Sequence, residues 1–219
     1  MVKLGNPKNA FWEAFFLALL VFIFGIFMGV AYENSRLNTI NEYYALSEIA
    51  LMDGLAMSNL IDLDINNCDE LINFNLDFAD RIYFEALSLI KYEDAGKITN
   101  DLRLAHKKYD VLRTFLWINN MKVLEKCEGN LSTVVYLYEY GEEDLNKKAI
   151  NSVWSKVLSD LKQKKGNEIL LLSLAVDSDL VSLNSVLNQF EISQYPAVII
   201  NNEDVIEELL SVEELEAYL

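Results

Sequence analysis

The sequence predicts an α+β protein in three parts: an N-terminal transmembrane helix, a helical stalk and a C-terminal α/β domain. Three features of the 219 residues indicate this order. An apolar run comes first, a helical spacing of apolar residues follows it to about Lys126, and from Thr133 strand-like and helix-like stretches alternate. We therefore expect a short tail, a membrane span, a stalk and an α/β domain at residues 1–10, 11–32, 33–129 and 130–219.

The apolar run at residues 11–32 contains a single charged side chain, that of Glu13. At about 1.5 Å of rise per residue, a helix of this length reaches across the roughly 30 Å hydrocarbon core of a bilayer. Lys3 and Lys8 precede the run. The positive-inside rule therefore predicts a cytoplasmic tail and places the C-terminal bulk outside the cell membrane.

A cleaved signal peptide is the alternative, because Gly29-Val30-Ala31 offers small residues at which a peptidase could cut. The apolar regions of signal peptides run to about 7–15 residues, which is shorter than this one. We therefore favour an uncleaved signal anchor.

The chain is strongly acidic, with a formal net charge of −16 and an isoelectric point near 4.4. Such a field repels nucleic acid and anionic lipid headgroups, so neither is expected as a partner. His106 is the only histidine, which leaves almost nothing for a histidine-based metal site or a Ser/His or Cys/His pair. We assign no cofactor, no metal and no catalytic residue.

Three stretches between residue 34 and about residue 126 carry apolar residues at helical spacing. The first continues from the membrane span and is broken by the loop 62–67, and the other two are separated by a break around Gly96. Two helices joined by a short turn form an antiparallel hairpin, to which the first helix adds a third member. We expect a coiled-coil spacer next to the membrane; a homo-oligomer formed through its helices belongs to the alternative of a purely structural stalk.

The two cysteines lie on opposite sides of the hairpin turn, Cys68 28 residues before Gly96 and Cys127 31 residues after it. The difference corresponds to about 4.5 Å of helix rise, so both thiols return to the same end. In an oxidising compartment this favours a structural disulfide. A redox-active pair, which lacks the CxxC spacing that lowers a thiol's pKa, and two unrelated free thiols are the alternatives.

Asn130-Leu131-Ser132 is an N-x-S sequon at the junction between stalk and last domain. On the predicted topology it lies outside the membrane, so Asn130 is a candidate glycosylation site.

The last domain is predicted from alternating strand and helix patterns, including an apolar run at 168–176 that is typical of a strand covered on both faces. Acidic residues lead the first turn of the helix expected at 142–165. The residues of this helix expected to face inward are Leu145, Ile150, Val153, Trp154, Val157, Leu158 and Leu161. The elements expected, in order, are strand 133–140, helix 142–165, strand 168–176, helix 182–190, strand 197–201, strand 204–208 and a capped helix from Ser211.

The order β-α-β-α-β-β-α, with Pro196 just before the third strand, resembles the thioredoxin fold. The resemblance covers about residues 131–219 and is carried by the segments TVVYLYEY, ILLLSLAV, FEISQYPAVII and SVEELEAYL. In that family the proline before the third strand is cis and lies beside the active-site disulfide. The resemblance therefore implies a cis Tyr195–Pro196 bond, at a strand start where proline removes no essential ladder bond.

The family's redox CxxC follows the first strand and opens the first helix, where this chain has residues 141–145 without a cysteine. Thiol-disulfide exchange there needs a thiolate at the helix N-terminus, so the resemblance implies a redox-inactive domain. We interpret Glu142 and Glu143 as stabilising the helix N-terminus and not as acid/base catalysts.

In that fold the residue before the cis-proline offers its backbone to an extended substrate, which requires no thiol. Tyr195 takes this position, with an acidic and aromatic rim suited to a basic or aromatic segment; a packed surface tyrosine is the alternative. The candidate peptide-binding residues are Tyr195, Pro196, Tyr140, Glu142 and Glu143.

We therefore expect a polypeptide-binding or scaffolding protein with a protein partner in the envelope. The alternatives are an envelope thiol-disulfide oxidoreductase that uses Cys68 and Cys127, and a purely structural helical stalk.

Overall fold

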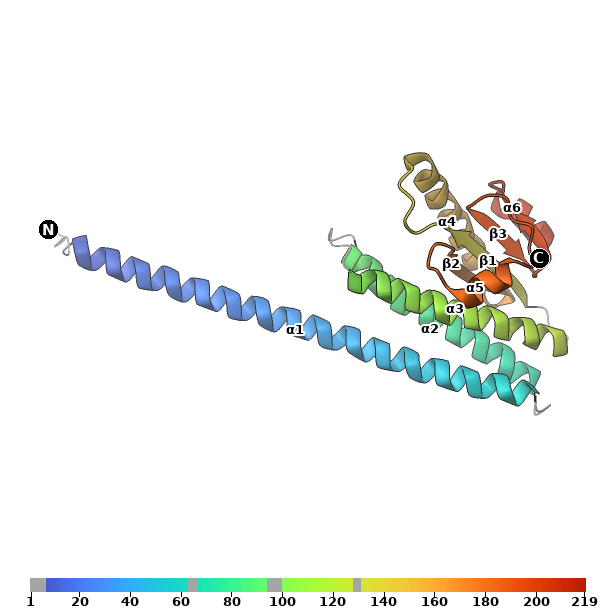
Figure 1. Cartoon of the computed structure of the whole chain (residues 1–219), viewed down its shortest axis with the longest axis horizontal. Coiled ribbons are helices and arrows are strands. Elements are labelled where there is room, and N and C mark those ends of the chain that lie inside the picture. Colours follow the sequence, from blue (N-terminus) through green and yellow to red (C-terminus); the bar gives the residue numbers. More distant parts are fainter. Residues whose placement is uncertain (1–6, 63–66, 94–99, 128–130) are drawn as a thin grey trace. The chain divides into compact units, whose positions relative to one another are not determined.

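The computed structural model describes residues 7–62, 67–93, 100–127 and 131–219. The chain divides into two compact units, residues 1–49 and 50–219. Helix α1 (Pro7–Asp62) is continuous and belongs to both units (Figure 1). The apolar run and the helical segment that follows it are therefore one helix, as expected. The expected turn at Gly96 and the sequon residue Asn130 lie outside the described residues.

The first unit contains the apolar part of α1. Its stretch Phe11–Ser35 is long and apolar enough to cross a membrane, with a mean hydropathy of 2.7, and none of this apolar window is buried. The aromatic rings of Phe16, Phe22 and Phe27 are all more than half exposed. A helix that is apolar on every side and uncovered by the protein suits a lipid environment. It therefore fits a membrane anchor or a signal anchor.

The second unit begins with the end of α1 and with two paired helices, α2 (Cys68–Glu93) and α3 (Asn100–Lys126). Side-chain partners across the pair run in opposite directions along the chain: Asn75 bonds to Asn120, whereas Glu85, further along α2, bonds to Tyr109. The two helices are therefore antiparallel, as the sequence predicts.

A disulfide joins Cys68 to Cys127 at one end of this pair, with their Cα atoms 5.6 Å apart. The predicted pairing is thus present. The bond lies in an apolar cluster that includes Leu71 and Val123, with Met57 of α1 packed against it. Close packing of helices explains why apolar residues surround the bond on several sides.

The end of α1 approaches the helix pair closely at Gly54. A Cβ atom at this position would lie 2.7 Å from the Phe115 ring of α3 and 3.6 Å from the Phe74 ring of α2. Only glycine leaves room for these aromatic rings, so the contact depends on a missing side chain.

The α/β segment forms a mixed four-stranded sheet in the order β2-β1-β3-β4. Strand β1 pairs parallel to β2 and antiparallel to β3, and β3 pairs antiparallel to β4. The elements observed are β1 (Ser132–Tyr138), α4 (Leu145–Lys165), η1 (Gly166–Glu168), β2 (Ile169–Ala175), α5 (Val181–Leu187), β3 (Ala197–Ile200), β4 (Asp204–Ile206), α6 (Val212–Leu215) and η2 (Glu216–Tyr218).

Both faces of the sheet are covered, which explains the continuous apolar sequence of its central strands. On one face, Val134 and Tyr136 of β1 pack with Trp154 of α4 and Leu215 of α6. Helices α3 and α5 contact each other, and α3 also contacts β2 (Figure 1). Alternate side chains of β1, such as that of Leu137, are fully buried on the opposite face.

Helix α4 corrects two expectations. It begins at Leu145, with Asp144 as its N-cap, and its first turn contains no acidic residue. Of the side chains expected to face inward, those of Leu145, Ile150 and Val153 are 79%, 42% and 45% exposed. The buried side chains are those of Trp154, Leu158 and Leu161, because the sheet covers only one stripe of the helix.

A buried chain of amides joins the helix pair to the sheet. Asn120 of α3 accepts from Asn75 of α2 at 3.0 Å and donates to the Thr133 hydroxyl of β1 at 2.7 Å. The Thr133 amide in turn donates to Asn201 in the turn after β3. Asn75, Asn120 and Thr133 are all 0% exposed. These hydrogen bonds join α3 to α2 on one side and to β1 on the other. They therefore fix the position of α3 against the sheet.

The β3–β4 connection is a tight hairpin turn. Asn201 and Asn202 have φ angles of 51° and 59°, and the Glu203 amide donates to the Ile200 carbonyl at 3.0 Å. Asparagine tolerates this left-handed region better than other side chains that carry a Cβ. The turn also receives a bond from α3, because Trp117 Nε1 donates to Asn202 Oδ1 at 2.7 Å.

Candidate functional site

The predicted site residues gather at one edge of the sheet. Tyr138 at the end of β1 lies opposite Ala175 at the end of β2, and Leu137 lies opposite Ala197 at the start of β3. The loops that leave β1 and β2 and the segment that enters β3 therefore meet at this edge. We call the group formed by residues 139–144, Asp177 and residues 193–196 the corner.

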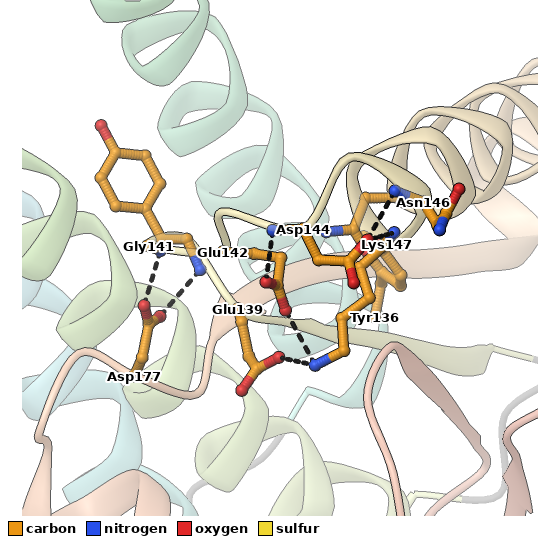
Figure 2. Close-up of polar contacts among 10 residues, drawn as sticks. Tyr136, Glu139, Gly141, Glu142, Asp144, Asn146, Lys147 and Asp177 are labelled. Atoms are coloured by element: carbon orange, nitrogen blue, oxygen red, sulfur yellow. Dashed lines mark hydrogen bonds and ion pairs between the residues drawn. The ribbon is translucent and has the colours of Figure 1, made fainter.

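Asp177 holds the start of the β1–α4 loop. Its two carboxylate oxygens accept hydrogen bonds from the backbone amides of Tyr140, at 2.8 Å, and Gly141, at 2.7 Å (Figure 2). A Cβ atom at Gly141 would lie 3.0 Å from Asp177 Oδ2. The close approach explains why a glycine suits this position.

The rest of this loop is organised by two acids. Asp144 caps α4 by accepting from the amides of Asn146, at 2.7 Å, and Lys147, at 3.4 Å. Glu142 accepts from the Asp144 amide at 2.8 Å (Figure 2). Asp144 thus satisfies backbone donors at the helix start and Glu142 satisfies the amide of the N-cap residue, which supports the interpretation of Glu142 as a structural group.

Lys147 links two carboxylates of the corner. Its Nζ lies 3.0 Å from Glu139 and 2.8 Å from Glu142 (Figure 2). The hydrogen bond from Lys147, helped by that from the Asp144 amide, lowers the pKa of Glu142 to about 2. Glu142 is therefore ionised at neutral pH and is not a proton donor.

The segment before β3 is held by Glu207, which follows β4. The Glu207 carboxylate accepts bonds from the amide and hydroxyl of Ser193 and from the amide of Gln194, the last at 3.1 Å. These bonds lower the pKa of Glu207. The Tyr195–Pro196 peptide bond is cis, as the resemblance implied.

Tyr195 combines a partly buried ring with an available backbone. Among the residues that the structure describes, neither its amide nor its carbonyl has a hydrogen-bond partner. Burial, together with the charges of Glu139 and Glu207, raises the pKa of the Tyr195 hydroxyl. The Tyr195 hydroxyl therefore lies in the field of two carboxylates, that of Glu139 just after β1 and that of Glu207 just after β4.

The other candidates divide between the corner and elsewhere. Pro196 is buried, Tyr140 is partly buried with its ring 4.4 Å from the His106 ring of α3, and Glu143 is exposed. Asn130 lies outside the described residues, so its glycosylation stays a prediction.

The Cys68–Cys127 disulfide is not part of the corner. Cys127 is 2% exposed and Cys68 is partly buried. An attacking thiolate needs access to a sulfur atom, and apolar packing around Cys127 restricts that access.

Sequence reasoning missed Asp177, Glu207, Lys147 and the contact of His106 with the corner. Asp177 directly follows a predicted strand, and this position was the one available signal. Nothing in the spacing of Glu207 or His106 shows that they return to this edge.

Within the described ranges no group of three or more His, Cys, Asp or Glu side chains is arranged to hold a metal ion. The corner combines charged side chains with partly buried apolar ones, and at Tyr195 it leaves a backbone amide and carbonyl available for hydrogen bonds. Neither a protein-family model nor a curated protein matches this sequence.

Proposed function

We propose that the chain is a single-pass membrane protein whose C-terminal region is a redox-inactive, thioredoxin-like, polypeptide-binding module outside the cell membrane. The topology is supported by the uncovered apolar helix Phe11–Ser35 and by Lys3 and Lys8 before it. The thioredoxin-like assignment is supported by the sheet order β2-β1-β3-β4, the parallel β1–β2 pair and the cis Tyr195–Pro196 bond.

The available peptide unit of Tyr195 carries the binding proposal. An extended segment that lies beside Tyr195 gains backbone hydrogen bonds of the kind made at sheet edges, and this requires no thiol. The carboxylates of Glu139, Glu142 and Glu207, together with the exposed Glu143 of the same loop, outnumber the one neighbouring cation identified, Lys147. A segment with basic side chains therefore fits the corner best.

The topology is tested by protease added to intact cells or spheroplasts. We expect digestion to remove the C-terminal region and to leave an N-terminal tag protected, because lysines that precede a span stay in the cytoplasm. A C-terminus that resists digestion until the membrane is broken would contradict the topology. It would also remove the argument from an oxidising compartment.

The binding proposal is tested with the full chain in lipid nanodiscs and labelled ten-residue peptides of alternating valine and lysine. We expect these peptides to bind at least about tenfold more tightly than valine–glutamate peptides, and less tightly as salt rises. Methylation of alternate backbone nitrogens is expected to abolish binding, because the paired amides lose their hydrogens.

A charge reversal at the corner provides the matched comparison. Glu143→Lys is expected to weaken the lysine peptide about threefold to fivefold, as one exposed charge does. Glu168→Lys makes the same change in net charge before the start of β2, at the opposite end of that strand, and is expected to have little effect. Equal losses from both variants, or equal affinity for both peptides, would contradict binding at the corner.

The oxidoreductase alternative predicts a different result. The corner contains no cysteine, and we expect no reduction of insulin by the full chain with dithiothreitol above the uncatalysed rate. Robust reductase activity that disappears in Cys68→Ser would establish the alternative. Helix association without peptide binding would instead favour the structural stalk.

A further inference from the structure

Helix α3 contacts both loops of the corner through residues spaced along its own first half. The His106 ring packs on the Tyr140 ring, with ring centres 4.4 Å apart. Lys107 Nζ donates to the Asp179 carbonyl, after β2, at 3.4 Å. One turn further along α3, Asp110 Oδ1 accepts from the amide of Ala175 at 3.4 Å. The loops that follow β1 and β2 therefore rest on the same helix.

Asp110 is the buried acid among these contacts. It is 2% exposed, and its Oδ2 atom has no hydrogen-bond partner among the residues that the structure describes. On its own helix the charged group facing it is Arg113, with Nη1 3.6 Å from Oδ1. From the sheet side the charged group is Asp177, which carries the same sign. An ionised Asp110 therefore has one long hydrogen bond, from the Ala175 amide, one nearby cation, Arg113, and one repelling carboxylate, Asp177.

Asp110 and the corner share a direct physical connection. Ala175 ends β2, and Asp177, two residues later, accepts the amides of Tyr140 and Gly141. If the end of β2 moves away from α3, Asp177 moves with it, and Asp177 is the residue that holds the β1–α4 loop. The His106–Tyr140 contact connects the same loop to α3 from the other side.

We propose that Asp110 is a proton-dependent contact between α3 and the sheet: the protonated side chain keeps the corner loops against α3, and its ionisation releases them. This contact is distinct from peptide binding. It controls whether the corner loops stay packed against α3, with or without a ligand. Its consequence for a bound segment rests on the proposed function.

The direction follows from the two states of the carboxyl group. Burial, only partly opposed by Arg113, raises the pKa of Asp110 from its ordinary value of 3.8 to about 7. In an opened state, where water reaches the group, the pKa returns towards the ordinary value. Opening therefore releases one proton between about pH 4 and pH 7. The opening constant rises by about tenfold per pH unit over that range and is level above it.

Amide hydrogen exchange of the full chain in detergent micelles tests this proposal without a ligand. The amides to follow are those of Ala175, Tyr140 and Gly141, measured from pH 5 to pH 8 and divided by the intrinsic exchange rate at each pH. We expect their protection to fall by roughly fiftyfold between pH 5 and pH 7. Asp110→Asn keeps an oxygen for the Ala175 amide and is expected to remove this pH dependence.

Two further variants separate Asp110 from its neighbours. Asp53→Asn neutralises an exposed acid of α1 and is expected to leave the profile unchanged. His106→Phe keeps an aromatic ring near Tyr140 but removes the imidazole that contacts the corner. Loss of the pH dependence in His106→Phe, or its persistence in Asp110→Asn, would overturn the proposal.

A direct titration covers the case in which Asp110→Asn does not fold. The ¹³C shift of the Asp110 carboxyl carbon in the wild-type protein is expected to change with a midpoint near pH 7. A midpoint near pH 4, or amide protection that does not change with pH in the wild type, would refute the proposal. Peptide affinity does not enter either readout, so failure of this proton-dependent contact and failure of the proposed function are separate results.

Discussion

Reduction of the Cys68–Cys127 disulfide is expected to lower the free energy of unfolding by roughly 4 kcal/mol. The bond closes a loop with a sequence separation of 59 residues. In the chain-entropy description, opening a loop of this size raises the conformational entropy of the unfolded chain and so stabilises the unfolded state by about that amount. The measurement is denaturant unfolding of the full chain in detergent micelles, with and without reductant.

Cysteine substitutions give the control for this effect. The double variant Cys68→Ala, Cys127→Ala is expected to match the reduced wild type, because alanine adds no hydroxyl group at the buried position of Cys127. In the double variant, reductant is expected to change nothing. Equal stability of oxidised and reduced wild type, or two free thiols in the oxidised protein, would be incompatible with a stabilising bond.

Replacement of Asn120 by alanine is expected to lower the free energy of unfolding by about 3 kcal/mol. The substitution leaves the amide of Asn75 without its acceptor and the Thr133 hydroxyl without its donor, both at positions that are 0% exposed. Unpaired buried polar groups cost about 1–3 kcal/mol each, and the lost side-chain volume adds to that cost. The same unfolding measurement checks the value.

Asn184 supplies the matched control, because it lies in α5 with an exposed side chain. Asn184→Ala is expected to change stability by less than about 0.5 kcal/mol. A similar small change in Asn120→Ala would show that water replaces the lost bonds. The buried amides would then not be what fixes α3 against the sheet.

The membrane-type helix was predictable from sequence because its evidence is local. Length and composition decide whether residues 11–32 can reach across a bilayer, and no distant residue alters that count. Local chemistry also decides helix ends. The predicted cap at Ser211 is present as a capping box, in which Ser211 and Glu214 satisfy each other's backbone amides.

The disulfide was predictable because helix rise is constant. Similar distances from the expected turn, 28 and 31 residues, return two residues to nearly the same level along the helix pair. The division of the chain into a stalk at 33–129 and a domain at 130–219 stays a prediction. In the structure, the end of α1, the helix pair and the sheet belong to one unit, residues 50–219.

Helix α4 shows where periodicity becomes insufficient. Its apolar residues cover a stripe wide enough for several orientations, and Leu145 and Trp154 are equally apolar in the pattern. The sheet decided between them, because it buries Trp154 completely and leaves Leu145 79% exposed. The spacing of apolar residues in the sequence shows how wide the apolar face of a helix is. It does not show how much of that face another element buries.

The sequence by itself determined the candidate span, a spacing that favours the Cys68–Cys127 pair, and the order of strands and helices along the chain. Only the tertiary structure decided which distant groups complete the corner. Asp177, Glu207 and His106 come from three different segments, and each reaches the corner through strand register or helix packing. Asp110 became a buried acid in the same way, because α3 docks on the end of β2. Burial and charge at such positions depend on contacts between residues far apart in the chain, which local spacing does not encode.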